Sequence, residues 1–355
     1  MKSLFTLLLS GFLFFTANAQ SFSSPESVEY DAANNRWFAG QNGSGVILVH
    51  SPGSNTLLPF ATGCTSGPHG LEIMGSVLYA CDGAYIRGFD LSNGSQVFSI
   101  NTGATFLNGL TTDGSTYLFA TDFTAKKIYR ICPSTNSYNI MCSTVKTPNG
   151  IYYDGANNRC VFVTWGSNAP VQAMSLADSS VSTLTSSTMG NCDGITRDAA
   201  GYWYVTAWTG NQLWRFDPAF SSAPISVMSG LSSPADIDIN SANDSIGIPN
   251  SGNANNVVYY TNITTGISLV NDNPSGEVYP NPANTNGFTI VIGREVNNGT
   301  AELYDLEGKL IRSQAFSGDR HFFAGESLPD GTYFVVIKED DAVLFKGKVL
   351  LAPSY

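Results

Sequence analysis

The feature that most limits how this 355-residue chain can fold is a short motif that recurs six times, about every 40 residues. The copies follow one pattern: a turn residue, a polar residue, a small residue, and then Ile, Leu or Val. The second positions are separated by 43, 39, 41, 44 and 42 residues. The six copies are Pro25–Val28, Pro68–Leu71, Leu107–Leu110, Pro148–Ile151, Cys192–Ile195 and Pro234–Ile237.

Further apolar or aromatic runs follow each copy, such as Leu78–Ala80 and, after a loop, Gln212–Asp217. A period near 40 residues with three or four short strands per unit is typical of propeller blades, which bury their faces against neighbouring blades. We therefore predict an all-β chain with a six-bladed β-propeller over residues 20–270. Two segments could supply the strand that closes the ring, Ile267–Val270 or Ser21–Ser23.

The polar position of the motif begins the innermost strand of each predicted blade, so the six positions should converge on the central channel. Oxygen ligands from such a ring could meet around a hard cation such as Ca²⁺. Asn and Asp also favour turns for purely local reasons, so both interpretations stay open. The six occupants are Glu26, His69, Asn108, Asn149, Asp193 and Ala235.

The N-terminus is typical of a secretory signal peptide. Lys2 provides the positive charge, Leu4–Phe15 the apolar segment, and Ala17–Ala19 a small-x-small cleavage site. We predict a signal peptide over residues 1–19. The alternative, a membrane anchor, is disfavoured because the apolar run is shorter than the ~20 residues of a spanning helix. No later segment is apolar enough to span a bilayer.

The charge balance argues against nucleic acid as a partner. Lys and Arg number 17 against 28 Asp and Glu, a formal net charge of −11, and no basic cluster exceeds the pair Lys126–Lys127. Binding to nucleic acid needs cations that neutralise phosphates.

Six cysteines in an exported chain favour disulfides, although their pairing cannot be deduced from sequence alone. Cys132 and Cys142 flank a turn-rich stretch, which favours a bond across a hairpin. The remaining pairs would then be Cys160–Cys192 and Cys64–Cys81. Since there is no Cys-x-x-Cys motif, a cysteine-based metal or redox site has little support.

After a polar linker (271–276), residues 277–355 show about seven short strand-like segments, which predict a small β-sandwich. Its characteristic motifs are Tyr279–Pro282, Leu303–Lys309, Leu328–Val335 and Lys346–Leu350. With these motifs the region resembles the type A C-terminal sorting domain of type IX secretion cargo. The resemblance implies a Gram-negative cell, Sec export, and secretion or surface attachment through type IX machinery that engages residues 277–355.

Several segments of the predicted propeller are distinctive: Glu26–Ser27, Asn34–Phe38, Pro68–Leu71, Asn149–Ile151, Asp193–Val205 and Asn211–Pro218. In these segments the propeller resembles the senescence-marker/regucalcin/gluconolactonase group and, more distantly and through Pro68–Leu71, the paraoxonases. The resemblance implies a central divalent cation, most simply Ca²⁺. The ligands that it implies are Glu26, Asn149 and Asp193, with Asn108 nearby.

Two functions follow as hypotheses. The first is a Ca²⁺-dependent lactonase or ester hydrolase for a small-molecule substrate, in which Asp193 or His69 activates water as a general base. His69 could instead be a neutral group that merely lines the channel. A serine hydrolase is excluded because no Gly-x-Ser-x-Gly motif occurs. The second is a non-catalytic NHL-type propeller that binds glycans, peptides or surface partners, with Trp165 and Trp208 stacking on sugars or packing between blades.

Overall fold

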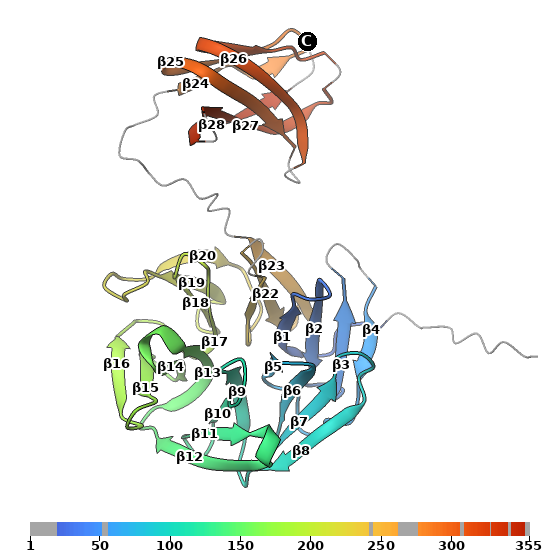
Figure 1. Cartoon of the computed structure of the whole chain (residues 1–355), viewed down its shortest axis with the longest axis vertical. Coiled ribbons are helices and arrows are strands. Elements are labelled where there is room, and N and C mark those ends of the chain that lie inside the picture. Colours follow the sequence, from blue (N-terminus) through green and yellow to red (C-terminus); the bar gives the residue numbers. More distant parts are fainter. Residues whose placement is uncertain are drawn as a thin grey trace, which may run out of the picture. The chain divides into compact units, whose positions relative to one another are not determined.

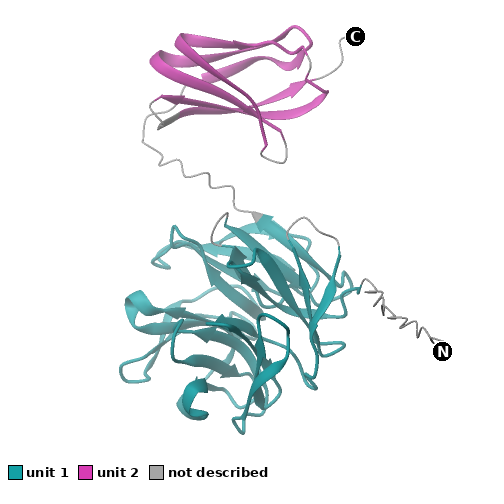
Figure 2. Ribbon diagram, turned by 45° about the vertical axis from the view of Figure 1, so that its right-hand side comes forward, with its two compact units in different colours: residues 1–263 teal, residues 264–355 magenta. Residues whose placement is uncertain are grey.

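The computed structural model describes residues 20–51, 56–240, 244–261, 276–305, 309–326, 328–339 and 342–351. The chain divides into two compact units, residues 1–263 and 264–355 (Figure 2). The predicted signal peptide, the candidate closing strand Ile267–Val270 and most of the predicted linker lie outside the described residues.

The first unit consists of six antiparallel sheets arranged around a central channel, which confirms the predicted six-bladed propeller (Figure 1). Each sheet is a meander whose first strand is innermost. Blades one to three comprise β1 (Pro25–Asp31), β2 (Arg36–Gln41), β3 (Val46–His50), β4 (Leu58–Ala61), β5 (Leu71–Met74), β6 (Val77–Asp82), β7 (Tyr85–Asp90), β8 (Gln96–Asn101), β9 (Leu107–Thr112), β10 (Leu118–Asp122), β11 (Lys127–Cys132) and β12 (Ser137–Ser143).

Blade six has three strands in the described part of the chain, whereas the other blades have four. Short 3₁₀ turns occupy Pro133–Thr135 and Gly155–Asn157. Blades four to six comprise β13 (Thr147–Asp154), β14 (Arg159–Trp165), β15 (Val171–Ser175), β16 (Val181–Thr185), β17 (Cys192–Arg197), β18 (Trp203–Ala207), β19 (Gln212–Phe216), β20 (Ile225–Ser229), β21 (Asp238–Asn240), β22 (Ser245–Asn250) and β23 (Asn256–Thr261).

The hydrophobic core of the propeller lies between its blades. Second strands such as β10 and β18 are buried along their whole length, because both faces of each blade pack on a neighbour. Outer strands such as β8 and β12 are largely exposed. One hydrophobic cluster fills each of the six interfaces between blades, and Phe38, Phe162 and Trp203 are among the fully buried side chains.

The ring closes where blade six meets blade one. The Asp236 main-chain N–H donates to the Glu26 carbonyl oxygen (3.0 Å), and the Tyr30 main-chain N–H donates to Asp238 Oδ2 (2.8 Å). Ser21–Ser23, one of the two predicted closing segments, forms no strand. Within the described residues, closure therefore rests on packing and hydrogen bonds, without an exchanged strand.

Two hairpins between first and second strands share one ion-paired turn. In blade one the Arg36 Nε donates to Asp31 Oδ2, and in blade four the Arg159 Nε donates to Asp154 Oδ2, each at 2.8 Å. Asp154 is 1% exposed in its side chain and also pairs with Arg197 of blade five at 3.4 Å. The second contact makes Asp154 a link between blades.

All six cysteines are unpaired in this structure, so disulfides stay a prediction. The predicted Cys132–Cys142 bond across the hairpin is wrong in its geometry. Cys132 lies opposite Ser137, and Cys142 lies opposite Ile128 at the other end of β11. At ~3.3 Å per residue this separation far exceeds the ~7 Å between Cα atoms that a disulfide can bridge.

The second unit is a small β domain of five strands in its described part, fewer than the predicted seven or so. The sheet order is β24-β28-β27-β25-β26, and β24 also pairs with β25, so the sheet curls back on itself. The long β25 shows register shifts against β26, which let this one strand bend. The strands are β24 (Gly276–Asn284), β25 (Gly287–Tyr304), β26 (Leu310–Phe323), β27 (Gly331–Glu339) and β28 (Ala342–Leu351).

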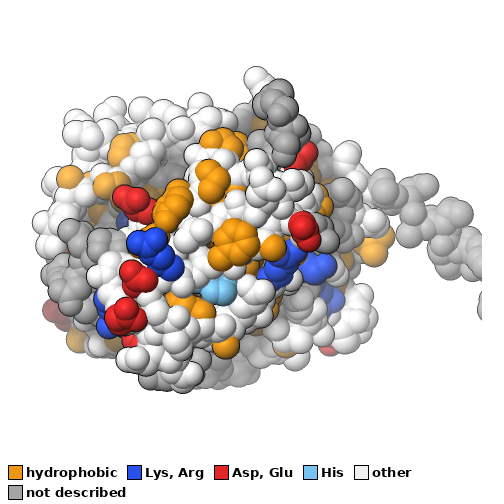
Figure 3. Space-filling view, turned by 90° about the horizontal axis from the view of Figure 1, so that it is seen from above, with side chains coloured by type: hydrophobic (Ala, Val, Ile, Leu, Met, Phe, Trp, Pro, Cys, Tyr) orange, Lys and Arg blue, Asp and Glu red, His pale blue; other side chains and the backbone are white. Residues whose placement is uncertain are grey.

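Inward side chains such as Phe288, Leu303 and Val335 form the core of this second unit. Several large hydrophobic side chains stay outside that core, among them Phe322, which is 55% exposed. On the face of the molecule drawn in Figure 3, hydrophobic side chains are interspersed with basic and acidic ones.

Candidate functional site

The six predicted channel positions all lie buried at or just before the innermost strands. These strands contact one another around the centre of the propeller. Glu26, Asn108, Asn149 and Asp193 lie within β1, β9, β13 and β17, while His69 and Ala235 precede β5 and β21. We call this set the channel ring; its members are 8% exposed or less (Glu26, His69, Asn108, Asn149, Asp193 and Ala235).

The small residue after each ring position has a packing reason. In blades two to five this residue is a glycine, and a Cβ added to it would lie under 3.0 Å from the main-chain oxygen of the next ring residue. Gly150, for example, packs against the carbonyl oxygen of Asp193, and Gly109 against that of Asn149. The innermost strands can converge so closely only because these positions lack a side chain.

Asn149 and Asp193 carry polar atoms that are buried without a partner. Asn149 donates from Nδ2 to the Cys192 carbonyl oxygen (3.2 Å), but its Oδ1 accepts no hydrogen bond. Asp193 Oδ1 is likewise buried and unpartnered. Buried polar atoms without a partner are rare in folded proteins and point to a missing ion, ligand or water.

The electrostatics of the ring disfavour charge when nothing is bound. Burial raises the pKa of Asp193 well above its ordinary value; repulsion from Glu26 and Asp236 adds to this, and the Asn149 and Trp208 side chains act against it. Burial also raises the pKa of Glu26, although Ser251 donates to Glu26 Oε2 at 2.6 Å. These effects indicate that Glu26 and Asp193 lie near each other, as the ring prediction requires.

His69 is a neutral group in this environment. Burial lowers its pKa to about 4, against the effect of the Asp82 carboxylate. Its Nδ1 is buried without a partner, and its ring packs edge-on against Phe106 with centroids 4.6 Å apart. Asn108, by contrast, makes no side-chain hydrogen bond to any described residue.

Four aromatic side chains from blades three to five contact one another in succession, and the first of them, Phe106, contacts His69. We call these four residues the aromatic arc (Phe106, Phe123, Trp165 and Trp208). Successive centroids lie 5.9, 5.7 and 5.2 Å apart. All four side chains are partly exposed. Trp165 and Trp208 therefore pack on each other between blades, as one of the two sequence alternatives predicts, while stacking on sugars stays a prediction.

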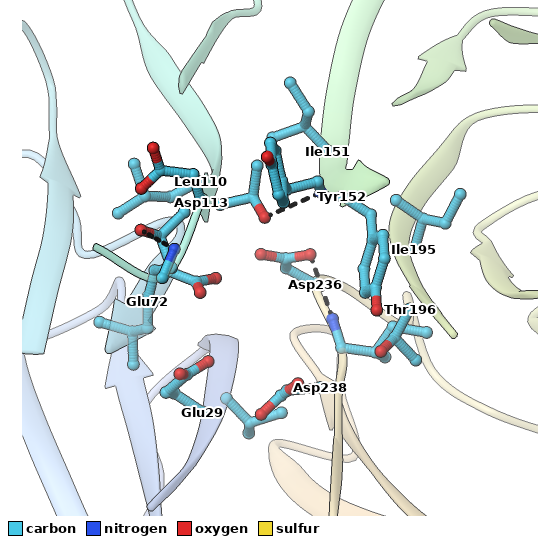
Figure 4. Close-up of a pocket in the computed structure, with 17 residues that line it drawn as sticks. Glu29, Glu72, Leu110, Asp113, Ile151, Tyr152, Ile195, Thr196, Asp236 and Asp238 are labelled. Atoms are coloured by element: carbon cyan, nitrogen blue, oxygen red, sulfur yellow. Dashed lines mark hydrogen bonds between the residues drawn. The ribbon is translucent and has the colours of Figure 1, made fainter. Parts of the chain in front are cut away.

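Sequence reasoning missed a second polar region of the channel. A cavity of about 330 Å³ is lined by the apolar fourth residue of all six motifs and by five acidic residues (Glu29, Glu72, Asp113, Asp236 and Asp238; Figure 4). We call it the acidic cavity. The sequence does contain a pattern that could have predicted it. The residue after the apolar fourth position of the motif is acidic in blades one, two and six.

Main-chain donors hold two of these carboxylates. Ile73 N–H donates to Glu29 Oε1 (2.9 Å), and Tyr30 N–H donates to Asp238 Oδ2. Burial raises the pKa of Asp238 to about 6, and burial together with repulsion from Asp238 and Glu72 raises the pKa of Glu29 well above its ordinary value. Across the described residues, no three His, Cys, Asp or Glu side chains are grouped closely enough to hold a metal ion. A cation in the channel would therefore also need amide or main-chain oxygens.

Comparison with known proteins identifies the second unit. Residues 277–350 match the family model of the secretion system C-terminal sorting domain. The C-terminal unit is a sorting domain. It indicates interaction with the type IX secretion machinery, and export to the cell surface or the medium. In the part of the chain that the structure covers, no helix is long and apolar enough for a membrane crossing.

The propeller has structural relatives that share its fold at low identity. A structural genomics protein of unknown function from Bacteroides thetaiotaomicron is 12% identical (TM-score 0.58; 68% of this chain and 70% of that chain covered). A chain of the nidogen/laminin complex is 14% identical (TM-score 0.53; 82% and 98%). The Swd1 β-propeller domain of Myceliophteria thermophila is 8% identical (TM-score 0.51; 69% and 99%).

No curated protein matches the chain. The structural matches establish the propeller fold alone. The resemblance to the gluconolactonase group is not confirmed by them and stays a prediction.

Proposed function

We propose that this exported propeller binds a divalent cation, most simply Ca²⁺, at the channel ring and there hydrolyses small lactones or esters. One observation carries the proposal. Asn149 Oδ1 and Asp193 Oδ1 are both buried, both lack a partner, and belong to adjacent innermost strands.

The residues of the ring suit such a cation. Ca²⁺ takes carboxylate and amide oxygens, which Glu26, Asn149 and Asp193 offer, and Asn108 could add a fourth. Burial and mutual repulsion penalise the charges of Glu26 and Asp193, and a cation between them would remove both penalties. When bound, the cation would polarise the carbonyl of a lactone or ester.

His69 is one candidate for the general base. Its depressed pKa leaves the imidazole uncharged at neutral pH, so it would not repel a neighbouring cation. The lone pair of Nδ1, in the tautomer that leaves it free, could accept a proton from water. Asp193 is the alternative base, but a carboxylate that serves as a cation ligand has less freedom to accept a proton.

The aromatic arc favours a second candidate function, carbohydrate binding without catalysis. Four partly exposed aromatic side chains could stack on the faces of sugars. The polar side chains of the channel ring could then form hydrogen bonds with the sugar hydroxyl groups. The same surface could accept a peptide or another surface partner.

The test uses the full chain from Gln20 in Ca²⁺ or in EDTA. We expect Ca²⁺ to raise the Tm of the wild type, Asp193→Asn to abolish most of this rise, and Asp178→Asn, an exposed aspartate of blade four, to leave it intact. Absence of a Ca²⁺ effect in the folded wild type would remove the cation site.

Turnover is measured on valerolactone, gluconolactone and para-nitrophenyl acetate. If His69 is the base, His69→Gln should keep the Ca²⁺-dependent Tm rise and reduce hydrolysis by roughly 100-fold or more. A Ca²⁺ effect without hydrolysis of any probe would overturn the hydrolase and leave the binding function, which glycan arrays would then examine.

A further inference from the structure

The acidic cavity is distinct from the channel ring in its lining and its chemistry. Glu29, Glu72 and Asp238 follow the apolar positions of the motif, three residues beyond the ring positions of blades one, two and six. The equivalent residues of the other three blades are Thr111, Tyr152 and Thr196. This position of the repeat is thus acidic in three blades and hydroxyl-bearing in the other three. Asp113 of blade three adds a further carboxylate to the lining, where it accepts from the main-chain N–H groups of residues 115–117.

The carboxylates of the cavity have no basic counterpart in its lining. No lysine or arginine is among the residues that line the cavity. Arg197 follows Thr196 in sequence, but its guanidinium is engaged by the Asp154 carboxylate, the Gly201 carbonyl oxygen and the Trp203 ring. Burial and mutual repulsion raise the pKa values of Glu29 and Glu72 well above their ordinary range. Negative charge gathered in this way is costly unless a cation compensates it.

Polar groups in the cavity are left without partners. Thr196 is 2% exposed and lines the wall, yet its hydroxyl makes no hydrogen bond to any described residue. Asp236 is 9% exposed and projects into the cavity (Figure 4), where the one hydrogen bond that its carboxylate accepts from a described residue comes from the Ile237 main-chain N–H at Oδ1 (3.2 Å). Glu72 makes no hydrogen bond within the described residues. These groups point to a ligand that donates several hydrogen bonds.

The lining also favours an organic ligand over a bare metal ion. The carboxylates are not grouped closely enough to coordinate one ion together. The volume of about 330 Å³ corresponds to roughly ten water molecules, which is enough for a small organic compound. Six aliphatic side chains encircle the same space and would contact its carbon atoms (Val28, Leu71, Leu110, Ile151, Ile195 and Ile237).

We propose that the acidic cavity binds a small organic cation, an alkylammonium or guanidinium compound. Its charged end donates hydrogen bonds to Glu72 and Asp236, and its carbon chain packs against the aliphatic collar. Thr196 and Tyr152 accept from, or donate to, its far end. This assignment does not depend on a cation or on hydrolysis at the channel ring.

The test is calorimetric titration of the full chain from Gln20, in EDTA, with putrescine, a four-carbon diamine. Butanediol, with the same carbon chain and no charge, is the matched ligand control. We expect saturable heat with the diamine and none with the diol. Glu72→Gln should weaken the diamine about tenfold or more, because it removes one charge-assisted hydrogen bond. The exposed Asp178→Asn should bind as the wild type does.

Misfolding does not obscure this test. Glu72→Gln removes a poorly compensated charge, so its Tm should equal or exceed that of the wild type. The absence of diamine binding to the folded wild type, or equal affinity for the diol, would overturn the proposal. A parallel titration with CaCl₂ in a chelator-free buffer examines the alternative: Ca²⁺ binding that Glu72→Gln abolishes, without diamine binding, would make the cavity a metal site instead.

Discussion

Gly150 of blade four packs directly on the main-chain carbonyl oxygen of Asp193 in blade five, with no room for a Cβ between them. Asp193, a proposed ligand of the cation, and the glycine that lets the innermost strands converge are thus in contact. Substitutions of Asp193 test the proposed cation site, and substitutions of Gly150 test the close packing of the innermost strands.

The first prediction concerns this contact. Gly150→Ala should destabilise the propeller by about 1–3 kcal/mol, because the added methyl group would overlap main-chain atoms. At about 2–4 °C per kcal/mol for a unit of this size, thermal unfolding resolves the change. Gly155→Ala is the control, since its Cβ would meet the Tyr153 side chain, which can move. Equal losses for the two variants would contradict close packing of the innermost strands.

The second prediction is a pH dependence of the chelated, ligand-free protein. Asp238, with its folded-state pKa raised to about 6 from 3.8, holds its proton in the folded state where the unfolded chain has lost it. Ionisation therefore opposes folding, and stability should fall as pH rises from about 5 to 8, by roughly 1 kcal/mol from this group alone.

Glu29 and Glu72, whose pKa values are also raised, act in the same direction. Thermal unfolding in EDTA across this pH range measures the effect. Asp238→Asn should flatten the curve of Tm against pH, because the amide does not ionise in this range. The variant should still fold, since the amide oxygen can accept the hydrogen bond from the Tyr30 main-chain N–H. A Tm that rises with pH in the wild type would refute the argument.

The third prediction concerns the two matching hairpins. Asp154→Ala should cost about 3 kcal/mol, because it leaves two partly buried guanidinium groups, those of Arg159 and Arg197, without their carboxylate. Asp31→Ala in blade one removes a carboxylate that pairs with Arg36 alone, so its loss should be smaller. Thermal unfolding of both variants gives the comparison, and a larger loss at Asp31 would reverse the inferred ranking.

The fourth prediction concerns cysteine pairing after export. The Cys64 thiol affects the pKa of Cys81, and the Cys142 thiol that of Cys160, which indicates that the members of each pair lie close together. If the oxidising environment outside the cytoplasm forms disulfides, Cys64–Cys81 and Cys142–Cys160 are the pairs expected. Peptide mapping without reduction would detect them. A Cys132–Cys142 peptide would be incompatible with the register of β11 and β12.

The channel ring could be predicted from the sequence because its residues occupy one position of the repeat. The spacing of Glu26, Asn149 and Asp193 predicted that they surround the channel, since equivalent positions of the blades converge there. The same register could have revealed Glu29, Glu72 and Asp238, which occupy one position of the repeat in three blades. Their proximity to one another was less accessible, because blades six and one are neighbours only after the ring has closed.

What the sequence determined by itself was periodic or local: the six blades, the turn residues, the glycines beside the ring and the motifs of the sorting domain. These depend on spacing and on side chains near in sequence. The tertiary structure alone decided which atoms remain without partners. Asn149 Oδ1 and Asp193 Oδ1 are unsatisfied, and Asp236 faces a cavity, because strands about 40 residues apart come together and exclude the water that would otherwise solvate these groups.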